Sequence, residues 1–343
     1  PGGGTFDNGW AVAYDVAVDP TDESVYVGGM FAENAEFEST DAVSMTRATV
    51  GDRDAYIAKY SSDGVVLRVD QFGAVANSTY DHLMRVYVRA LAVDTVGNIY
   101  AAGKFGAMST GSSYPIPGTI DLDPGPGTAE RTVVGSWDGF VVKLDSVGGF
   151  VGGHAFGGLS SDEGTGVAVD SNGQTYVVGQ FAGQASFGGA TLTSEGVEDS
   201  FISVLDADFN YMRTHRLGGE GYDHARGVAV ADPGMVLLAG DFQSTASLPT
   251  GQLLDATGGS DLFVSRFNTT APVLEIASPT RGMATSLVAE GSSLALSGVV
   301  ADDDLGTSDV EWSLMPDGVP LGVGEFLTVP AGSLPVGDHL IVG

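Results

Sequence analysis

The chain has 343 residues, and its 43% of apolar side chains can fill the cores of two or three domains. Its 44 acidic residues outnumber 14 Lys and Arg, and a formal net charge of −30 argues against nucleic acid or anionic lipid as a partner. It contains no cysteine, which excludes disulfides, thiol nucleophiles and Cys-ligated metals, and no apolar run reaches the length of a membrane span.

One pattern recurs four times along the chain and predicts four similar sheets. Each copy begins with an alternating strand, at residues 16–19, 91–94, 167–170 and 228–231. A second strand ends in a Gly-x-Phe motif, with the phenylalanines Phe31, Phe105, Phe181 and Phe242. An acidic residue then opens a third strand, and these residues are Asp54, Asp138, Asp199 and Asp261. A fourth strand closes the first three copies at 71–73, 154–158 and 216–219.

Four short strands per copy are the anatomy of a propeller blade. The 51 glycines follow no Gly-X-Y period, and with many Val, Ala, Thr and Phe they indicate an all-β protein with tight turns. Residues 170–173, Asp-Ser-Asn-Gly, supply the positive-φ residues of such a turn between a first and a second strand.

These motifs resemble the bacterial seven-bladed β-propeller repeat, which is related in style to NHL repeats. The similarity covers about residues 5–268, and 120–128 is similar to an insert found between the second and third strands of such repeats. The resemblance implies blades at about 5–74, 75–158, 159–219 and 220–268. Because only four copies are present, we expect either an open arc or a four-blade closure.

The N-terminal residues 2–9 are similar to residues 157–164, where one copy leads into the next. We therefore expect this chain to be a piece of a larger protein, and no secretion signal is visible in it.

Residues 269–343 change character after a polar linker that ends in Pro272. The segments 293–300, 310–314 and 337–342 resemble parts of a bacterial immunoglobulin-like domain of the polycystic-kidney-disease type. The resemblance implies a truncated β-sandwich with Trp312 in its core.

No motif of a catalytic or phosphate-binding site is present, such as His-Glu-x-x-His or Gly-x-Ser-x-Gly. His82 and His224 follow Tyr-Asp in two copies and are candidates for metal binding or acid–base catalysis, but repeat equivalence explains them more simply.

Calcium is the ligand that the sequence motivates best, because carboxylate oxygens are its preferred ligands in proteins. The candidate residues form two groups, Asp302, Asp303, Asp304 and Asp309 in the C-terminal segment, and Asp121 and Asp123 in the propeller insert. Neither group has EF-hand spacing.

The sequence predicts a non-catalytic, secreted or cell-surface interaction module of a larger bacterial protein, which binds a protein or a carbohydrate through its blade loops. We expect the insert 107–136 to be a surface lobe and the main docking feature. Two alternatives remain. One is a polysaccharide lyase or glycoside hydrolase, which basic and aromatic residues converging on one rim would favour. The other is carbohydrate binding through Trp10 and Trp137, although we expect both to pack between blades.

Overall fold

The computed structural model is all-β, as the composition predicts, and its sheets are antiparallel. It describes residues 9–41, 43–75, 81–107, 118–232, 235–248, 253–256 and 258–268, followed by the six strands β24–β29. The one helical element in these residues is a short 3-10 turn, η1 (Asp81–Leu83). The chain divides into two compact units, residues 1–248 with 253–265, and residues 249–252 with 266–343.

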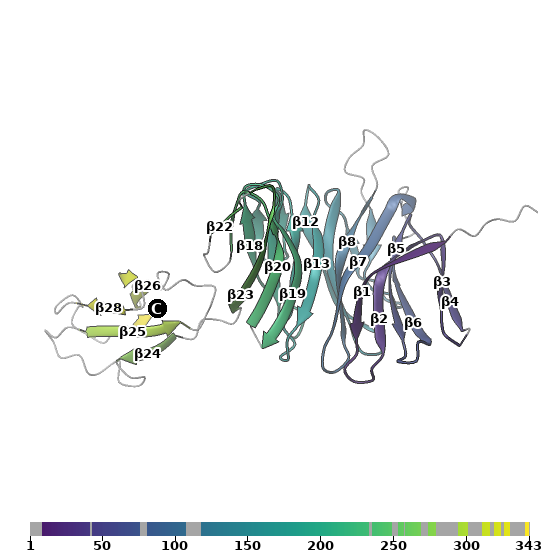
Figure 1. Ribbon diagram of the computed structural model, residues 1–343, viewed down its shortest axis with the longest axis horizontal. Coiled ribbons are helices and arrows are strands. Elements are labelled where there is room, and N and C mark those ends of the chain that lie inside the picture. Colours follow the sequence, from purple (N-terminus) through teal and green to yellow (C-terminus); the bar gives the residue numbers. More distant parts are fainter. Residues whose placement is uncertain are drawn as a thin grey trace, which may run out of the picture. The chain divides into compact units, whose positions relative to one another are not determined.

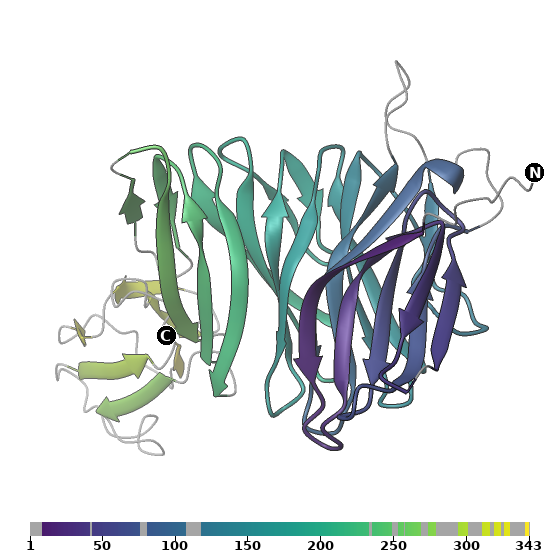
Figure 2. The same cartoon turned by 45° about the vertical axis from the view of Figure 1, so that its right-hand side comes forward.

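The first unit contains four sheets that follow one another in chain order (Figures 1 and 2). Sheet 1 consists of β1 (Trp10–Val18), β2 (Val25–Ala32), β5 (Asp54–Tyr60) and β6 (Val66–Phe72). Sheet 2 consists of β7 (Met84–Val93), β8 (Ile99–Ala107), β11 (Trp137–Leu144) and β12 (Phe150–Gly158). Sheet 3 consists of β13 (Glu163–Val169), β14 (Thr175–Phe181), β17 (Asp199–Leu205) and β18 (Tyr211–Gly219). Sheet 4 consists of β19 (His224–Asp232), β20 (Met235–Phe242) and β23 (Asp261–Asn268).

A short hairpin separates the second and third strands of every sheet, a regular feature that the sequence pattern did not predict. The hairpins are β3 (Asn34–Glu38) with β4 (Ser44–Ala48), β9 (Thr119–Asp121) with β10 (Glu130–Thr132), β15 (Gln184–Ser186) with β16 (Thr191–Thr193), and β21 (Thr245–Ser247) with β22 (Leu253–Asp255). Hairpins β15–β16 and β21–β22 pair with the last strand of the preceding sheet. They therefore join neighbouring repeats by backbone hydrogen bonds.

The sheets pack face to face, and apolar side chains fill the space between them. Between sheets 1 and 2 these include Tyr26, Ile57, Leu91 and Phe140, and between sheets 2 and 3 they include Tyr100, Val141, Val167 and Phe201. A third cluster, with Phe31, Phe37 and Tyr56, lies under hairpin β3–β4.

The turn between the first and second strands is built on an aspartate. Asp170 Oδ1 accepts the backbone N–H groups of Asn172 and Gln174 at 2.9 Å each, and Gly173 takes a φ of +84°. The Tyr176 hydroxyl donates to Asp170 Oδ2 at 3.0 Å. Asp94 and Tyr100 repeat this arrangement in sheet 2. The recurring aspartate therefore fixes the hairpin.

The expectation that residues 107–136 form a surface lobe holds only in part, because residues 125–128 are exposed while other residues of the insert belong to the core. Ile120 and Leu122 are fully buried in the core between sheets 1 and 2, and Ala129 and Val133 join them. The Ser, Gly and Pro content of the insert concealed these alternating apolar residues. Residues 108–117 lie outside the described residues.

The second unit contains two three-stranded sheets. One has β24 (Leu274–Ser278), β25 (Leu294–Val300) and β28 (Phe326–Val329), and the other has β26 (Glu311–Met315), β27 (Val319–Val323) and β29 (Leu340–Val342). Two small antiparallel sheets agree with the all-β prediction. The immunoglobulin-like identity of this unit, its core tryptophan and the propeller identity of the first unit stay predictions.

Candidate functional site

The first strand of every sheet carries a β-bulge at the same position. The register shifts between Ala13 and Asp15, Val88 and Ala90, Gly164 and Gly166, and Ala225 and Gly227. The extra residues are Tyr14, Arg89, Thr165 and Arg226. A bulge takes one residue out of the ladder and redirects its side chain, which is a common way to position functional groups.

A cluster of aromatic and cationic side chains surrounds the first two bulges. We call it the aromatic–cationic cluster, and it comprises Trp10, Tyr14, Tyr87 and Trp137 with Arg53, Arg85, Arg89 and Lys104. The Arg89 guanidinium lies 4.3 Å from the centroid of the Tyr14 ring and 5.2 Å from that of Tyr87. The rings of Tyr87 and Trp137 lie 5.7 Å apart. The members come from β1, β7, β8 and β11 and from the residue before β5, so the stacking of sheets 1 and 2 assembles the cluster.

Cation–π contacts and one long hydrogen bond hold the remaining members of the cluster. Arg53 lies 5.0 Å from the Trp10 ring and donates to the Tyr87 hydroxyl at 3.3 Å. Lys104 Nζ lies 5.3 Å from the Trp137 ring. Each such contact contributes about 0.5–1 kcal/mol at a partly exposed site.

Glu163, at the start of β13, forms ion pairs with two of the cations. Arg89 Nε lies 2.6 Å from Glu163 Oε1, and Lys104 Nζ lies 2.8 Å from Glu163 Oε2. Arg85 pairs with Asp52. Arg53 Nε lies 3.6 Å from Asp52 Oδ2 as well, so two carboxylates are shared by the four cations of the cluster.

Solvent reaches the cluster through two aromatic rings. Trp10 is 42% exposed and Tyr14 is 38% exposed, whereas Trp137 is half-buried against Tyr87. The expectation that Trp10 packs between sheets is therefore wrong. Trp10 lies on the first strand of sheet 1, and the Arg53 guanidinium lies over its ring. Exposed aromatic rings can stack on a ligand, and the guanidinium groups beside them can donate hydrogen bonds to it.

Two series of buried aspartates occupy the junctions between repeats, and their role is structural. Asp138 Oδ2 accepts the backbone N–H of Val134 at 2.9 Å, and Asp199 Oδ2 accepts that of Glu195 at 3.0 Å. Asp162 Oδ2 accepts the N–H of Gly158 at 2.8 Å, and Asp223 accepts that of Gly219 at 2.9 Å.

Burial raises the pKa of three of these carboxyl groups. The pKa rises to about 7 at Asp162 and to about 6 at Asp138 and Asp223, because desolvation outweighs the hydrogen bonds that these groups accept. Such values suit a general acid, but the three side chains are buried and a substrate does not reach them. They are not candidates for catalysis.

The proposed equivalence of His82 and His224 is wrong. His224 stands two residues before the bulge residue Arg226, where Tyr87 stands before Arg89, whereas His82 lies in the turn η1. The nitrogens of His224 lie 3.0 Å from Glu198 Oε2 and 3.2 Å from Asp241 Oδ2. The chain has extra residues before β7, so His82 and His224 do not occupy the same position of the repeat.

The calcium candidates fall in two places. Asp302, Asp303, Asp304 and Asp309 lie outside the described residues. Asp121 Oδ1 accepts the N–H groups of Asp123 and Ala129, and Asp123 Oδ1 accepts that of Gly125, so these oxygens stabilise the hairpin loop. Within the described part of the chain, no three His, Asp or Glu side chains gather in a way that could hold a metal. Calcium binding stays a prediction.

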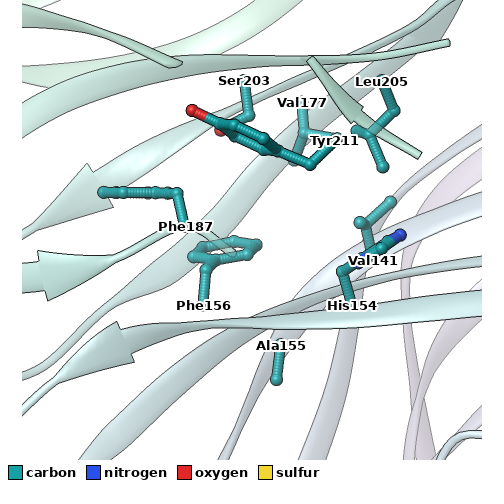
Figure 3. A pocket seen from close by; sticks show the side chains of 9 residues that line it. All are labelled: Val141, His154, Ala155, Phe156, Val177, Phe187, Ser203, Leu205 and Tyr211. Atoms are coloured by element: carbon teal, nitrogen blue, oxygen red, sulfur yellow. The ribbon is translucent and has the colours of Figure 1, made fainter. Parts of the chain in front are cut away.

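An apolar crevice lies between the outer strands of sheets 2 and 3 (Figure 3). Phe156, Phe187 and Tyr211 line it together with His154, whose Nε2 lies 2.7 Å from the Phe209 carbonyl oxygen. The crevice has room for little more than a water molecule. It is a packing gap and not a substrate pocket.

Comparisons with known proteins give one partial similarity. No family model matches the chain. Over 186 residues the chain is 27% identical to the regulatory protein FlaEY of Caulobacter vibrioides, a match that covers 53% of this chain and 18% of that protein. The matched region is therefore less than a fifth of FlaEY. Of the helical residues described here, none form a helix long and apolar enough to cross a membrane.

Proposed function

We propose that the chain is a non-catalytic binding module of propeller-type repeats, which recognises an acidic carbohydrate through the aromatic–cationic cluster. The observation that carries this proposal is the position of Trp10 and Tyr14, two exposed rings held beside Arg53 and Arg89. Aromatic rings pack on the apolar faces of sugar rings, and guanidinium groups form paired hydrogen bonds with carboxylates. The seven-bladed resemblance supports the repeat assignment.

The local charge favours an anionic ligand over a neutral one. Arg89 and Lys104 already share Glu163, so a carboxylate on the ligand can compete for the same donors. The chain has only 14 Lys and Arg residues, so a group of four basic side chains is a place where an anion finds several hydrogen-bond donors. Raising the salt concentration should weaken the binding, because exposed ion pairs are screened.

The wider setting is the one that the sequence predicts, a secreted or cell-surface module of a larger bacterial protein with a second, immunoglobulin-like unit. FlaEY is named as a regulatory protein, and a module that acts by binding is compatible with a role of that kind.

A titration of uronic-acid oligosaccharides against the chain tests the proposal. We expect saturable heat with the acidic oligosaccharide and much weaker heat with the neutral oligosaccharide of the same length. Trp10→Ala should weaken the affinity about tenfold, which corresponds to the loss of about 1.4 kcal/mol of stacking energy. Arg89→Gln should weaken it and also reduce its dependence on salt.

Tyr222→Ala is the matched control, because Tyr222 is a similarly exposed ring that lies in the fourth repeat, outside the cluster. Equal affinities of Trp10→Ala and Tyr222→Ala for the ligand, or no binding by the unmodified chain, would contradict the proposal.

The alternative function, a polysaccharide lyase or glycoside hydrolase, is favoured by the convergence of basic and aromatic residues on one region. The same oligosaccharides, incubated for a long period, decide between the two. New reducing ends or unsaturated uronate products would show an enzyme and remove the non-catalytic assignment, whereas intact oligosaccharide supports a binding module.

A further inference from the structure

The outward face of sheet 4 is apolar and exposed. Leu262 and Val264 on β23 are 79% and 71% exposed, and Leu237 and Ala239 on β20 are exposed beside them. The opposite face of these strands carries Leu238 and other buried residues that pack toward the interior. Exposed apolar residues that gather on one sheet face indicate a contact surface.

The same positions are fully buried in the three preceding sheets. The residue three places after the aspartate that opens the third strand is Val264 in sheet 4, and its counterparts Ile57, Val141 and Ile202 are at most 2% exposed. Leu237 corresponds in the same way to the buried residues Tyr26, Tyr100 and Tyr176. In sheets 1 and 2 these residues pack against the following sheet. Sheet 4 therefore presents a face that is built to receive another sheet.

Sheet 1 presents the complementary face at the other end of the row. Val16 on β1 is 60% exposed, although its counterparts Leu91 and Val167 are buried against the preceding sheet. Ala13 is exposed as well, whereas its counterpart Val88 is fully buried. Figure 2 shows β1 and β2, in purple, at one end of the row and the green strands of sheet 4 at the other.

The contacts between successive sheets within the chain define which residues would meet if the exposed face of sheet 4 packed against that of a sheet 1. A Cβ on Gly164 of sheet 3 would lie 3.2 Å from the Ala102 Cβ of sheet 2, and a Cβ on Gly28 of sheet 1 would lie 2.6 Å from Val88 Cγ1 of sheet 2. In the repeat, Gly164 and Val88 correspond to Ala13, and Ala102 and Gly28 correspond to Ala239. The same stacking, continued past sheet 4, brings Ala239 against Ala13.

We infer that the chain associates head to tail with a second copy of itself, with sheet 4 of one copy stacked on sheet 1 of the next. Three interior interfaces of the same design set the geometry of this contact. A head-to-tail contact uses two different surfaces, so it forms closed rings or open arrays instead of stopping at a symmetric dimer. This contact does not rest on the proposed carbohydrate binding. Trp10 corresponds in the repeat to Arg85 and Ser161, which form bridges to the preceding sheet, so the second copy would lie beside Trp10.

The charge of the chain makes this association dependent on salt. Two copies that each carry a net charge of −30 repel one another at low ionic strength, while the contact itself is apolar. Raising the salt concentration should therefore strengthen self-association, the opposite of the effect expected for binding of an acidic carbohydrate.

Sedimentation velocity of the full chain and of blocked variants tests the inference. The unmodified chain should form larger species as its concentration rises. Val16→Glu and Val264→Glu should each need at least about tenfold higher concentration to associate, because a buried carboxylate without a partner is costly. A mixture of the two should give a one-to-one dimer, since one variant keeps its sheet 4 face and the other keeps its sheet 1 face. Val147→Glu, at an equally exposed residue in the turn after β11, should associate like the unmodified chain.

Engineered thiols identify the contact, because the chain has no cysteine of its own. Ala239→Cys mixed with Ala13→Cys should form an intermolecular disulfide, and neither should do so with Val147→Cys. The inference is overturned if the unmodified chain stays monomeric at every concentration and at high salt, or if the Val16→Glu and Val264→Glu mixture stays monomeric. It is also overturned if Val264→Cys in the monomer resists maleimide, which would show that another part of the same chain covers this face.

Discussion

Gly179→Ala is expected to destabilise the first unit by about 3–5 kcal/mol, one of the largest effects that a single methyl group can have in this fold. A Cβ at Gly179 would lie 1.9 Å from the Glu163 carbonyl oxygen and 2.8 Å from Phe201 Cε1. The first contact is with backbone, which cannot rotate away. Either the bulge in β13 opens or β14 separates from β13, and both changes break ladder hydrogen bonds.

The same restriction holds at every copy of the Gly-x-Phe motif. The Cβ of an alanine would lie 1.9 Å from the Val12 carbonyl oxygen at Gly29, 1.8 Å from that of Tyr87 at Gly103, and 2.2 Å from that of His224 at Gly240. The glycine and the bulge opposite it therefore form one structural element.

Gly227→Ala is the matched control, because Gly227 lies in a first strand and no atom lies within 4 Å of the position of its Cβ. We expect the free energy of unfolding of this variant to lie within about 0.5 kcal/mol of that of the unmodified chain. Urea unfolding followed by tryptophan fluorescence measures both variants, and equal midpoints would contradict the steric account.

The second large effect is that the chain loses stability as the pH rises from about 5 to about 8, by on the order of 3 kcal/mol. Burial raises the pKa of Asp162 to about 7 and those of Asp138 and Asp223 to about 6, above the ordinary value of 3.8. Between the unfolded and the folded pKa, the folded state binds protons that the unfolded state has released. The bound protons therefore stabilise the folded state at acidic pH. This stabilisation is lost as the pH rises through the pKa values of the three carboxyl groups in the folded state.

Asp138→Asn isolates this effect from the general repulsion in an acidic protein. A Cβ on Gly157 would lie 2.9 Å from Asp138 Oδ1 and 2.8 Å from Asp162 Oδ2, so the two carboxylates lie close to one another. Asp138 Oδ2 accepts the N–H of Val134 at 2.9 Å, and a weaker hydrogen bond from the backbone of Gly135 also reaches this carboxyl group. An asparagine keeps the accepting oxygen and directs its amide group toward Asp162.

We expect Asp138→Asn to be more stable than the unmodified chain at about pH 8 and to show a clearly smaller loss of melting temperature between about pH 5 and pH 8. The exposed Asp63→Asn is the control, and it should leave this dependence unchanged. If Asp138→Asn is less stable than the unmodified chain at the higher pH and its melting temperature falls just as much with pH, the raised pKa values are not the cause of the loss of stability.

The repeat pattern predicted the strands because it reflects local requirements. Short continuous apolar runs such as that of β17 mark strands that are covered on both faces. Asp170 and Gly173 mark a turn that needs a carboxylate and a positive φ. The sequence pattern alone did not explain the glycine of the Gly-x-Phe motif. The structure shows that this glycine admits the bulge of the neighbouring strand within the same sheet.

The sequence offered Trp10 and Trp137 as candidates for carbohydrate binding, but it did not predict the cations around them, since the cluster depends on contacts between different repeats. Arg53, Arg89 and Trp137 are far apart in the sequence, and only the stacking of sheets 1 and 2 brings them together with Tyr87. One signal was present. Arg85, Tyr87 and Arg89 alternate with the apolar residues of β7, which predicts that their long polar side chains lie on one face of the strand.

The most direct test of the stacked-sheet architecture is a disulfide between neighbouring sheets. Ala102 in sheet 2 and Gly164 in sheet 3 are separated by most of a repeat, yet a Cβ on Gly164 would lie 3.2 Å from the Ala102 Cβ, close to the spacing of a disulfide. In a chain without other cysteines, the double variant Ala102→Cys, Gly164→Cys should oxidise to one intramolecular disulfide, seen as a loss of two hydrogen masses and of both free thiols. Two thiols that stay free under oxidising conditions in the folded chain would contradict the stacking of successive sheets, and the proposed binding cluster would fall with it.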